Sequence, residues 1–301
     1  PWGLTARPAA AFQARRRGDM RFWKGHALGN DYLVLDGTGT APPAPAAIRG
    51  LCDRHRGVGA DGVLVADLDA EPVGLRIFNP DGGEAEKSGN GLRILGAWLR
   101  DAGRVGDAPF RVSLRDETVT LEVVASRDGV HTLRVDMGVP SFRAGDIPFT
   151  KVDPDREVSG LSLAVGGTPL GIHLVSIGNP HCVVFWDDVD DAVFRRLAPA
   201  LQANPAFTEG VNVQFARLVD DTVLEARIWE RGAGETLASG SSACAVAAAA
   251  HQSGRTDAGE VEVRMPGGAV TVTRSPDGRL VLTGEAVVVF EGEVEVERLV
   301  G

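Results

Sequence analysis

Two serines, Ser88 and Ser239, are the side chains of this sequence best placed to do chemistry on a small molecule. Each lies four residues after the glutamate of a Gly-Glu pair and directly before Gly-rich residues that open an apolar stretch. When segments 83–91 and 234–242 are aligned, glycine, glutamate, serine and glycine coincide at a shift of 151 residues, about half of the 301-residue chain. Such spacing is typical of an internal duplication.

The matched segments predict two helix N-termini that face one site. A helix that begins at 89–91 or at 240–242 presents unpaired backbone N–H groups and the positive end of its dipole. Two such ends, facing each other across a cleft, would hold one carboxylate between them. The simpler alternative is that each serine only caps its helix, which is a common role for serine. The matched positions of Ser88 and Ser239 favour the shared site.

The composition is that of an ordinary globular protein, with 44% hydrophobic and 24% charged residues, and the chain is long enough for two domains. The net charge of −10 argues against a nucleic-acid partner, because phosphate binding needs a basic surface. No apolar run approaches the roughly 18 residues of a membrane span. Three unevenly spaced cysteines predict no disulfide framework and favour a reducing cytoplasm: Cys52, Cys182 and Cys244.

The chain divides into an extension, two halves and a last strand. Residues 1–19 are rich in Ala, Pro and Arg without an apolar period. We expect them to be a flexible extension or sequence upstream of a natural start at Met20; a mitochondrial-type presequence is a further alternative. We then expect an N-terminal half at 20–135, a C-terminal half at 136–285, and a strand at 286–301 that returns to the N-terminal half.

The elements that position the serines are mostly strands, bounded by Gly and Pro. Segment 57–62 matches the dinucleotide fingerprint G-x-G-x-x-G, but a predicted helix precedes it and a predicted strand follows it. That order is the reverse of a Rossmann unit, so we reject dinucleotide binding. The pattern predicts helices at 48–55 and 92–99 and strands at 110–112, 118–124, 132–135, 261–265, 269–273, 279–283 and 286–298.

Two more pairs of segments support the duplication. Gly29-Asn30 recurs as Gly178-Asn179 at a shift of 149 residues, and segment 59–61 corresponds to 210–212 at a shift of 151. Matched segments in the same order predict an α+β fold built from two similar halves, each with many strands and about two helices.

Taken together, these residues resemble the diaminopimelate epimerase family of cofactor-independent amino-acid racemases and epimerases. The resemblance covers the chain from Met20 to its end. It implies two pseudo-symmetric halves, each a β-barrel-like sheet around a central helix, with the active site in the cleft between them. It also implies an amino-acid substrate, a role in lysine biosynthesis and a homodimer. The motifs that carry it are His-Ala-Leu-Gly-Asn-Asp at 26–31, Phe-Asn-Pro-Asp-Gly at 78–82, Ser-Gly-Asn-Gly-Leu-Arg at 88–93, Gly-Asn-Pro-His at 178–181 and Glu-Arg-Gly-Ala-Gly-Glu-Thr at 230–236.

The resemblance implies one proton-transfer residue on each face of the substrate Cα, at Ser88 and Ser239, as inversion of a stereocentre requires. It implies that His181 stands near one of them, and that Glu230 serves both catalysis and the far end of the substrate. The expected α-carboxylate contacts are the N–H groups around Gly89, Asn90, Gly240 and Ser241. The remaining contacts to the far end are Asn30, Asn79, Asn179, Asn212 and Arg231. Taken singly, each asparagine is as readily a turn former, and Glu230-Arg231 a surface ion pair.

The chain departs from the family at the two proton-transfer positions, where the family has cysteine and this sequence has Ser88 and Ser239. A thiol is easily tuned to a thiolate, whereas a serine hydroxyl needs an adjacent base. The three cysteines lie elsewhere and are expected in the core. Four alternatives stay open: an epimerase helped by His181 or a carboxylate such as Glu86, a dehydratase of hydroxylated amino acids, an amino-acid-binding protein without turnover, and deliberate replacement of both cysteines.

No metal and no organic cofactor is expected. The histidines form no zinc-spaced cluster, and no P-loop is present. Stabilisation of the carbanion by helix N-termini leaves no requirement for pyridoxal phosphate. The six histidines are His26, His55, His131, His173, His181 and His251.

Overall fold

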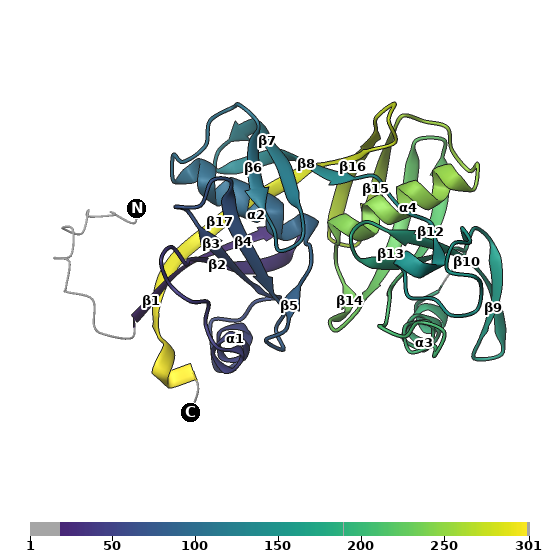
Figure 1. Ribbon diagram of the computed structural model, residues 1–301, viewed down its shortest axis with the longest axis horizontal. Helices are drawn as coiled ribbons and strands as arrows, with labels where there is room; N and C mark the ends of the chain where they lie inside the picture. The colour runs from purple at the N-terminus through teal and green to yellow at the C-terminus, as the bar shows by residue number, and fades with distance from the viewer. Residues whose placement is uncertain (1–18, 189, 300–301) are drawn as a thin grey trace, which may run out of the picture.

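The computed structural model describes residues 19–188 and 190–299, which form two lobes side by side (Figure 1). Of the expected N-terminal extension, residues 1–18 lie outside the described residues, and Asp19 already belongs to the first strand. Each lobe is a curved sheet with one helix inside it and one helix outside. The fold class is α+β, as predicted.

The N-terminal half begins with β1 (Asp19–Ala27) and β2 (Asn30–Asp36), followed by α1 (Pro45–Cys52) on the outside. After β3 (Val63–Asp67), β4 (Val73–Phe78) and β5 (Glu84–Ala85), the chain enters the central helix α2 (Gly89–Asp101). The half continues with β6 (Phe110–Ser113), β7 (Thr118–Arg127) and β8 (Val130–Gly138), and a short 3₁₀ turn η1 (Ala144–Asp146) follows.

The C-terminal half consists of β9 (Leu161–Val165), β10 (Thr168–Ser176), β11 (Pro180–Phe185), α3 (Asp191–Gln202), β12 (Asn212–Asp220), β13 (Val223–Glu230) and β14 (Gly234–Thr236). The chain then enters the central helix α4 (Gly240–Gln252). It ends with β15 (Glu260–Met265), β16 (Gly268–Arg274), β17 (Leu280–Glu295) and a 3₁₀ turn η2 (Val296–Leu299).

The order of strand pairing repeats between the halves. β1 to β8 pair in the order antiparallel, parallel, antiparallel, with β4 next to β6 in parallel. β10 to β17 repeat this order, with β13 next to β15 in parallel. The helices fall at the same places, with α1 and α3 after the second strand and α2 and α4 after the fifth. The duplication predicted from the sequence is therefore present at the level of topology.

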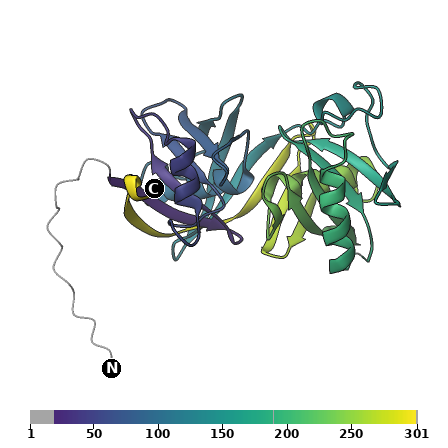
Figure 2. The same ribbon diagram turned by 90° about the horizontal axis from the view of Figure 1, so that it is seen from below.

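β17 joins the two halves. Residues 280–283 pair with β16 of the C-terminal half, residues 280–287 pair with β8 of the N-terminal half, and residues 287–295 pair with β1. In Figure 2 this strand runs from one lobe into the other. Its pairing with both β1 and β8 closes the N-terminal sheet into a barrel around α2.

The two central helices lie inside their barrels because their residues are mostly apolar or small, and the polar Asn90 and Arg93 of α2 are hydrogen-bonded within the core. Residues 89–99 of α2 and 240–250 of α4 are buried without exception. In α4 the run 243–250 consists of alanines with one cysteine and one valine, so surrounding strands can approach the helix closely. α1 and α3 instead cover the outside, each over its own apolar cluster.

The structure corrects several predicted boundaries. The first helix is Pro45–Cys52 rather than 48–55, because Pro is accepted in the first turn and the chain turns at Asp53. α2 is longer than 92–99, because its N-terminal glycines are helical. The sequence pattern predicts no residue range for α3, which contains Pro199. β17 is one strand, not two, because residues 284 and 285 between the two predicted strands continue the pairing with β8. Gly284 leaves room for the Arg93 guanidinium, which would lie 2.1 Å from an added Cβ.

The rejected dinucleotide motif lies in the loop after α1 and leads into β3, the order expected from the sequence. Cys52, Cys182 and Cys244 are buried and unpaired. Within the described residues, no helix is both long and apolar enough to cross a membrane.

The first testable feature is the close packing of Gly89 and Gly240. A Cβ added to Gly240 would lie 2.6 Å from the Leu282 side chain and 3.0 Å from Gly89 Cα. We expect Gly240→Ala to lower the free energy of unfolding by about 1–3 kcal/mol, because the crowded atoms must move apart. Chemical denaturation measures this. Gly171→Ala is the control, since its Cβ meets nothing within 4 Å. Equal midpoints for wild type and Gly240→Ala would contradict the packing.

Candidate active site

The floor of the candidate site is the meeting point of α2 and α4. Gly89 and Gly240 are the first residues of the two helices, and their backbones touch: an added Cβ on either would lie about 3 Å from the Cα of the other. Leu282 of β17 packs against both glycines. The two helices therefore direct the positive ends of their dipoles at one place.

Matched serines cap the two helices. Ser88 Oγ accepts a hydrogen bond from Gly91 N at 3.0 Å, and Ser239 Oγ accepts one from Ser242 N at 3.4 Å. Both caps have the same extended backbone, with φ/ψ of −139°/114° and −146°/124°. The third N–H group of each helix is thus satisfied. Among the described residues, the N–H groups at the first two positions have no partner: Gly89, Asn90, Gly240 and Ser241.

A cavity of about 470 Å³ opens above this floor. It lies between the halves and contains every residue predicted for the site except His181. The lining includes both serines, the four residues with free N–H groups, four further asparagines and the Glu230-Arg231 pair. These residues are Ser88, Ser239, Gly89, Asn90, Gly240, Ser241, Asn30, Asn79, Asn179, Asn212, Glu230 and Arg231.

The two serines have different neighbours. The phenol of Tyr32 lies 3.3 Å from Ser88 Oγ. Burial raises the pKa of Tyr32, while its contact with Ser88 works in the opposite direction, so the phenol stays protonated. On the other side, burial raises the pKa of the Glu230 carboxyl, and the hydroxyl of Ser239 opposes that rise. One serine therefore has a neutral hydroxyl beside it, and the other has a carboxyl group.

The asparagines divide into two groups. Asn90 Nδ2 donates to Asn30 Oδ1 at 2.9 Å and to Ala238 O at 3.0 Å, which ties the two halves together beside the floor. Asn212 accepts from Arg231 N at 2.9 Å and donates to Pro180 O at 3.0 Å. These side chains already hold the walls in place.

Two asparagine amides remain free for a ligand. Within the described residues, the side-chain NH₂ groups of Asn79 and Asn179 have no protein partner, although Asn179 Oδ1 has one. Both line the cavity, one from each half.

His181 lies behind the wall rather than in it. Its side chain is fully buried; Gln214 Nε2 donates to its Nδ1 at 3.0 Å, so Nε2–H donates to Asn179 Oδ1 at 2.8 Å. Burial lowers its pKa to about 3, and nearby Arg231 adds to this, so the ring is neutral near pH 7. This placement favours a positioning role for His181, through Asn179, over proton transfer; its catalytic assignment stays a prediction.

Sequence reasoning missed several lining residues. Tyr32 was detectable, because it lies two positions after Asn30 on one strand and therefore on the same face. Arg54 and Asp61 also line the cavity and pair with each other at 2.7 Å. Lys87 directly precedes Ser88, yet its ammonium is buried against Glu117, at 3.0 Å, and is not available as a base for the serine.

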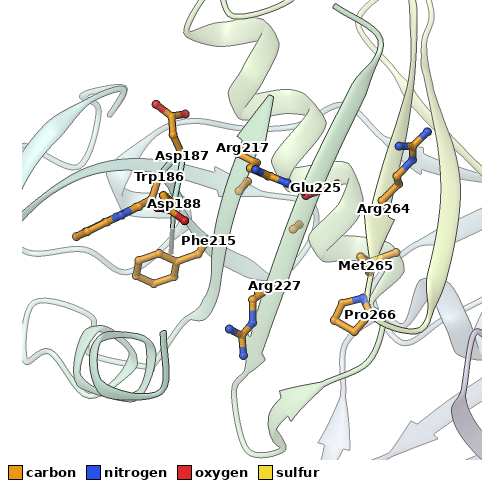
Figure 3. A pocket seen from close by; sticks show the side chains of 12 residues that line it. Trp186, Asp187, Asp188, Phe215, Arg217, Glu225, Arg227, Arg264, Met265 and Pro266 are labelled. Atoms are coloured by element: carbon orange, nitrogen blue, oxygen red, sulfur yellow. Dashed lines mark hydrogen bonds and ion pairs between the residues drawn. The ribbon is translucent and has the colours of Figure 1, made fainter. Parts of the chain in front are cut away.

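A second hollow, of about 440 Å³, lies on the outer face of the C-terminal half, where β13 and β15 separate (Figure 3). Its arginines are neutralised by carboxylates: Arg217 pairs with Glu225 and Arg227 with Asp191, each at 2.6 Å. None of the predicted site residues lines it. The cavity above the two helix N-termini is therefore the candidate active site. Among the described residues, no cluster of three or more metal-ligating side chains was found.

Comparison with known proteins supports the resemblance seen in the sequence. A family model described as Diaminopimelate epimerase matches residues 22–143 and 173–289. A Nostoc sp. protein named Diaminopimelate epimerase 2 is 40% identical over 281 residues, covering 92% of this chain and 96% of its own length. The diaminopimelate epimerase of Desulforudis audaxviator is 41% identical over 278 residues, covering 91% and 99%.

Solved structures share the fold at much lower identity. A hydroxyproline epimerase from Agrobacterium vitis aligns with a TM-score of 0.67 at 17% identity, over 93% of this chain and 94% of its own. A PhzF-family protein from Bacillus anthracis aligns with a TM-score of 0.68 at 19% identity, over 92% and 99%. At these identities, the two structures support only the two-half architecture.

The buried neutral histidine predicts a pH dependence of stability. The folded-state pKa of His181 is about 3, below its ordinary value of 6.5, so the unfolded chain binds more protons between these values. Its contribution is complete above pH 6.5 and is lost as the pH falls toward 3, at up to about 1.4 kcal/mol per pH unit. In urea unfolding, His181→Gln should flatten this dependence, whereas His55→Gln, at an exposed site, should not. Identical pH profiles for wild type and His181→Gln would contradict the burial of a neutral ring.

Proposed function

The chain belongs to the diaminopimelate epimerase family, and from that premise we propose that it inverts one α-carbon of diaminopimelate, or of a closely similar amino acid, without a cofactor. The observation that carries the proposal is the meeting of two serine-capped helix N-termini at the floor of one cavity. This arrangement offers donors for one carboxylate and a hydroxyl from each half of the molecule.

The α-carboxylate of the substrate binds to the free N–H groups at the two helix starts. Proton removal from Cα places negative charge on that carboxylate as an enediolate. Donors that are already oriented stabilise such charge without rearrangement of the protein. Because the floor is buried, its low local dielectric constant strengthens this interaction.

Ser239 and Glu230 act on one face of Cα. The carboxylate of Glu230 accepts a proton, with the Ser239 hydroxyl beside it as the relay. Burial raises the pKa of Glu230, which makes its carboxylate a stronger base than an exposed one. A serine hydroxyl can replace a thiol at this position only with an adjacent base, and Glu230 supplies that base.

Ser88 and Tyr32 act on the opposite face. Because the phenol is neutral, this side delivers a proton rather than removing one. An amino-acid Cα–H is a far weaker acid than a hydroxyl, so the carbanion takes a proton from Ser88 readily. The phenol at 3.3 Å then stabilises the oxygen that has lost it.

The far end of the substrate meets the upper wall of the cavity. Arg231 suits a second carboxylate through its planar fork of donors, and the free amides of Asn79 and Asn179 suit its oxygens. Glu230 lies against Ser239, so its role belongs to the reacting end rather than to the far end.

We also propose a cytoplasmic homodimer, as the family resemblance implies. Three buried, unpaired cysteines are what a reducing compartment permits. Light scattering of the purified chain measures the oligomeric state.

The competing function is dehydration of a hydroxylated amino acid, favoured by the two hydroxyl side chains in place of thiols. Incubation with LL-diaminopimelate in deuterated water separates the reactions. The proposed epimerase incorporates deuterium at Cα and forms the meso isomer. A dehydratase instead releases water from a hydroxylated amino acid to give an imine or keto product. Binding without either reaction supports a non-catalytic amino-acid-binding protein and overturns our proposal.

The same assay tests the two hydroxyls. We expect Ser88→Ala and Ser239→Ala each to lower the exchange rate by about 100-fold or more, because each removes the proton carrier on one face. Ser162→Ala, at an exposed position in β9, is the matched control and should leave the rate unchanged. Full activity in either active-site variant would contradict the assigned roles.

Replacing both serines by cysteine should raise epimerase turnover by about 10-fold or more, because a thiol with a pKa near 8.5 forms its conjugate base far more easily than a hydroxyl. Steady-state kinetics of the Ser88→Cys/Ser239→Cys double variant measure this. The thiol content of the variant, determined with a thiol reagent after unfolding, is the control for correct substitution. No gain in rate would show that the pocket is adapted to a different substrate.

A further inference from the structure

Lys87 is buried directly beside Ser88 in the chain. Its side chain is 1% exposed, and its ammonium donates to Glu117 Oε2 at 3.0 Å and to Met137 O at 3.1 Å. Glu117 belongs to the turn between β6 and β7, and Met137 belongs to β8. The residue that precedes Ser88 is therefore tied to two other elements of the N-terminal half.

The Lys87–Glu117 pair also lies against the C-terminal half. A Cβ added to Gly178, in the turn between β10 and β11, would lie 3.3 Å from Glu117 Oε1 and 3.8 Å from Lys87 Cδ. The next residue of that turn is Asn179, which lines the cavity. The pair thus connects the segment that carries Ser88 with a wall of the cavity that belongs to the opposite half.

The matched position in the C-terminal half has a different side chain. At a shift of 151 residues, Lys87 corresponds to Ala238, which is buried. The segment around Ser239 is held in another way, because Ser239 N donates to Met265 Sδ at 3.5 Å. Of the two serine segments, the one that carries Ser88 is therefore the one with a buried ammonium group.

The buried ammonium restrains this segment more strongly than an exposed ion pair does. Glu86, one residue earlier, pairs with Arg231 of the other half at 3.1 Å, but these side chains are 47% and 30% exposed. Such pairs contribute little, because water screens them. Displacement of Lys87 would instead leave a buried charge without partners, which costs far more free energy. Because Ser88 has an extended backbone, in which successive side chains point to opposite sides, fixing Lys87 also fixes the direction of Ser88.

We propose that Lys87 is a positioning residue, which holds the Ser88 hydroxyl on its face of the substrate Cα so that the carbanion is protonated with inversion. This inference rests on the proposed function and deepens it. Lys87 transfers no proton itself, since its ammonium is bound to Glu117 and to Met137 O. Its role follows from the sensitivity of proton transfer to geometry, because a displacement of about 1 Å costs up to about 100-fold in rate.

The fate of the carbanion reports on the position of Ser88. After a proton has left Cα on the Ser239 face, the carbanion takes a proton from Ser88, which gives the inverted product, or takes one back on the Ser239 face, which regenerates the substrate. In deuterated water, the second route labels the recovered LL-diaminopimelate once the returning group has exchanged with solvent. Displacement of Ser88 slows only the first route, so the ratio of labelled substrate to meso product rises.

Lys87→Met tests the role, because methionine has a similar length and no charge. We expect the ratio of labelled LL-diaminopimelate to meso product to rise by about 10-fold or more, and kcat for inversion to fall while KM changes by less than about 3-fold. Lys151→Met is the matched control, at an exposed site, and should leave the ratio unchanged. A smaller fraction of folded enzyme reduces both routes equally, so an unchanged ratio in Lys87→Met refutes the positioning role.

Glu117→Ala separates position from charge. This change leaves the ammonium of Lys87 in place and removes an anion, so an electrostatic effect of Lys87 on Ser88 would become stronger and the ratio would fall. Loss of positioning raises the ratio instead, in the same direction as Lys87→Met. The Glu117 side chain is 39% exposed, so its removal leaves no closed cavity in the core. A ratio that falls, or that stays at the wild-type value, would overturn the proposal.

A measurement without turnover keeps this inference separable from the proposed function. In Ser88→Cys the three native thiols are buried, so a thiol reagent reports on the new thiol. We expect addition of Lys87→Met to change its reaction rate by about 3-fold or more, and addition of Lys151→Met to leave it unchanged. A changed thiol rate in a chain without deuterium exchange at Cα retains the positioning of residue 88 and loses the epimerase assignment. Epimerisation with an unchanged ratio and an unchanged thiol rate retains the function and loses the role of Lys87.

Discussion

The contact between two helix N-termini is the constraint on which the rest of this structure depends. Gly89 and Gly240 touch, so two positive dipole ends and several N–H groups without protein partners are concentrated in one place. Like ends of dipoles repel, and the fold must hold them together before any anion arrives. It does so by enclosing each helix in its own barrel and by placing Leu282 of β17 against both glycines. The electrostatic cost is met during folding, which leaves the donors already oriented for a carboxylate.

Arg93 adds to this concentration of positive charge. Its side chain is fully buried, and within the described residues its partners are oxygens of neutral groups: Gly89 O, Asn90 Oδ1 and Glu285 O. Burial lowers its pKa to about 10, which still leaves the guanidinium charged at neutral pH. Burial of a cation without a carboxylate partner costs free energy, which hydrogen bonds to neutral oxygens offset in part. Here it lies directly beneath the floor and fixes Asn90, whose amide reaches the opposite half.

How much of this could be read from the sequence depends on the range of the interactions involved. The duplication, the two central helices and the two serine caps follow from repeats and local chemistry, because a cap acts within one helical turn. The sequence motifs also identified 12 of the 25 residues that line the cavity. Contacts between distant segments were beyond such reasoning. The hydrogen bond between Gln214 and His181 joins residues 33 apart, and the Glu86–Arg231 pair joins residues 145 apart. The sequence pattern divides β17 into strands at 279–283 and 286–298, because nothing local shows that Gly284 also pairs with Leu133 of β8 and packs against Arg93.

The two halves place matched serines in unmatched surroundings, and this asymmetry bears on the chemistry. A pair of thiols can exchange roles, since either is readily converted to a thiolate. Two hydroxyls cannot do so unless each has its own base, and the two serines differ here: Ser239 interacts with the carboxyl group of Glu230, whereas Ser88 has a neutral phenol beside it. The cysteines give no help: Cys244 is buried within α4, where burial raises its pKa to about 12. The geometry therefore favours proton removal on the Ser239 face and delivery on the Ser88 face. Inversion in the reverse sense requires the buried phenol or Ser88 to act as a base, which burial opposes. In the proposed mechanism, the duplicated fold supplies matched helix N-termini for the carboxylate, and the residues at which the two halves differ set the direction of proton transfer.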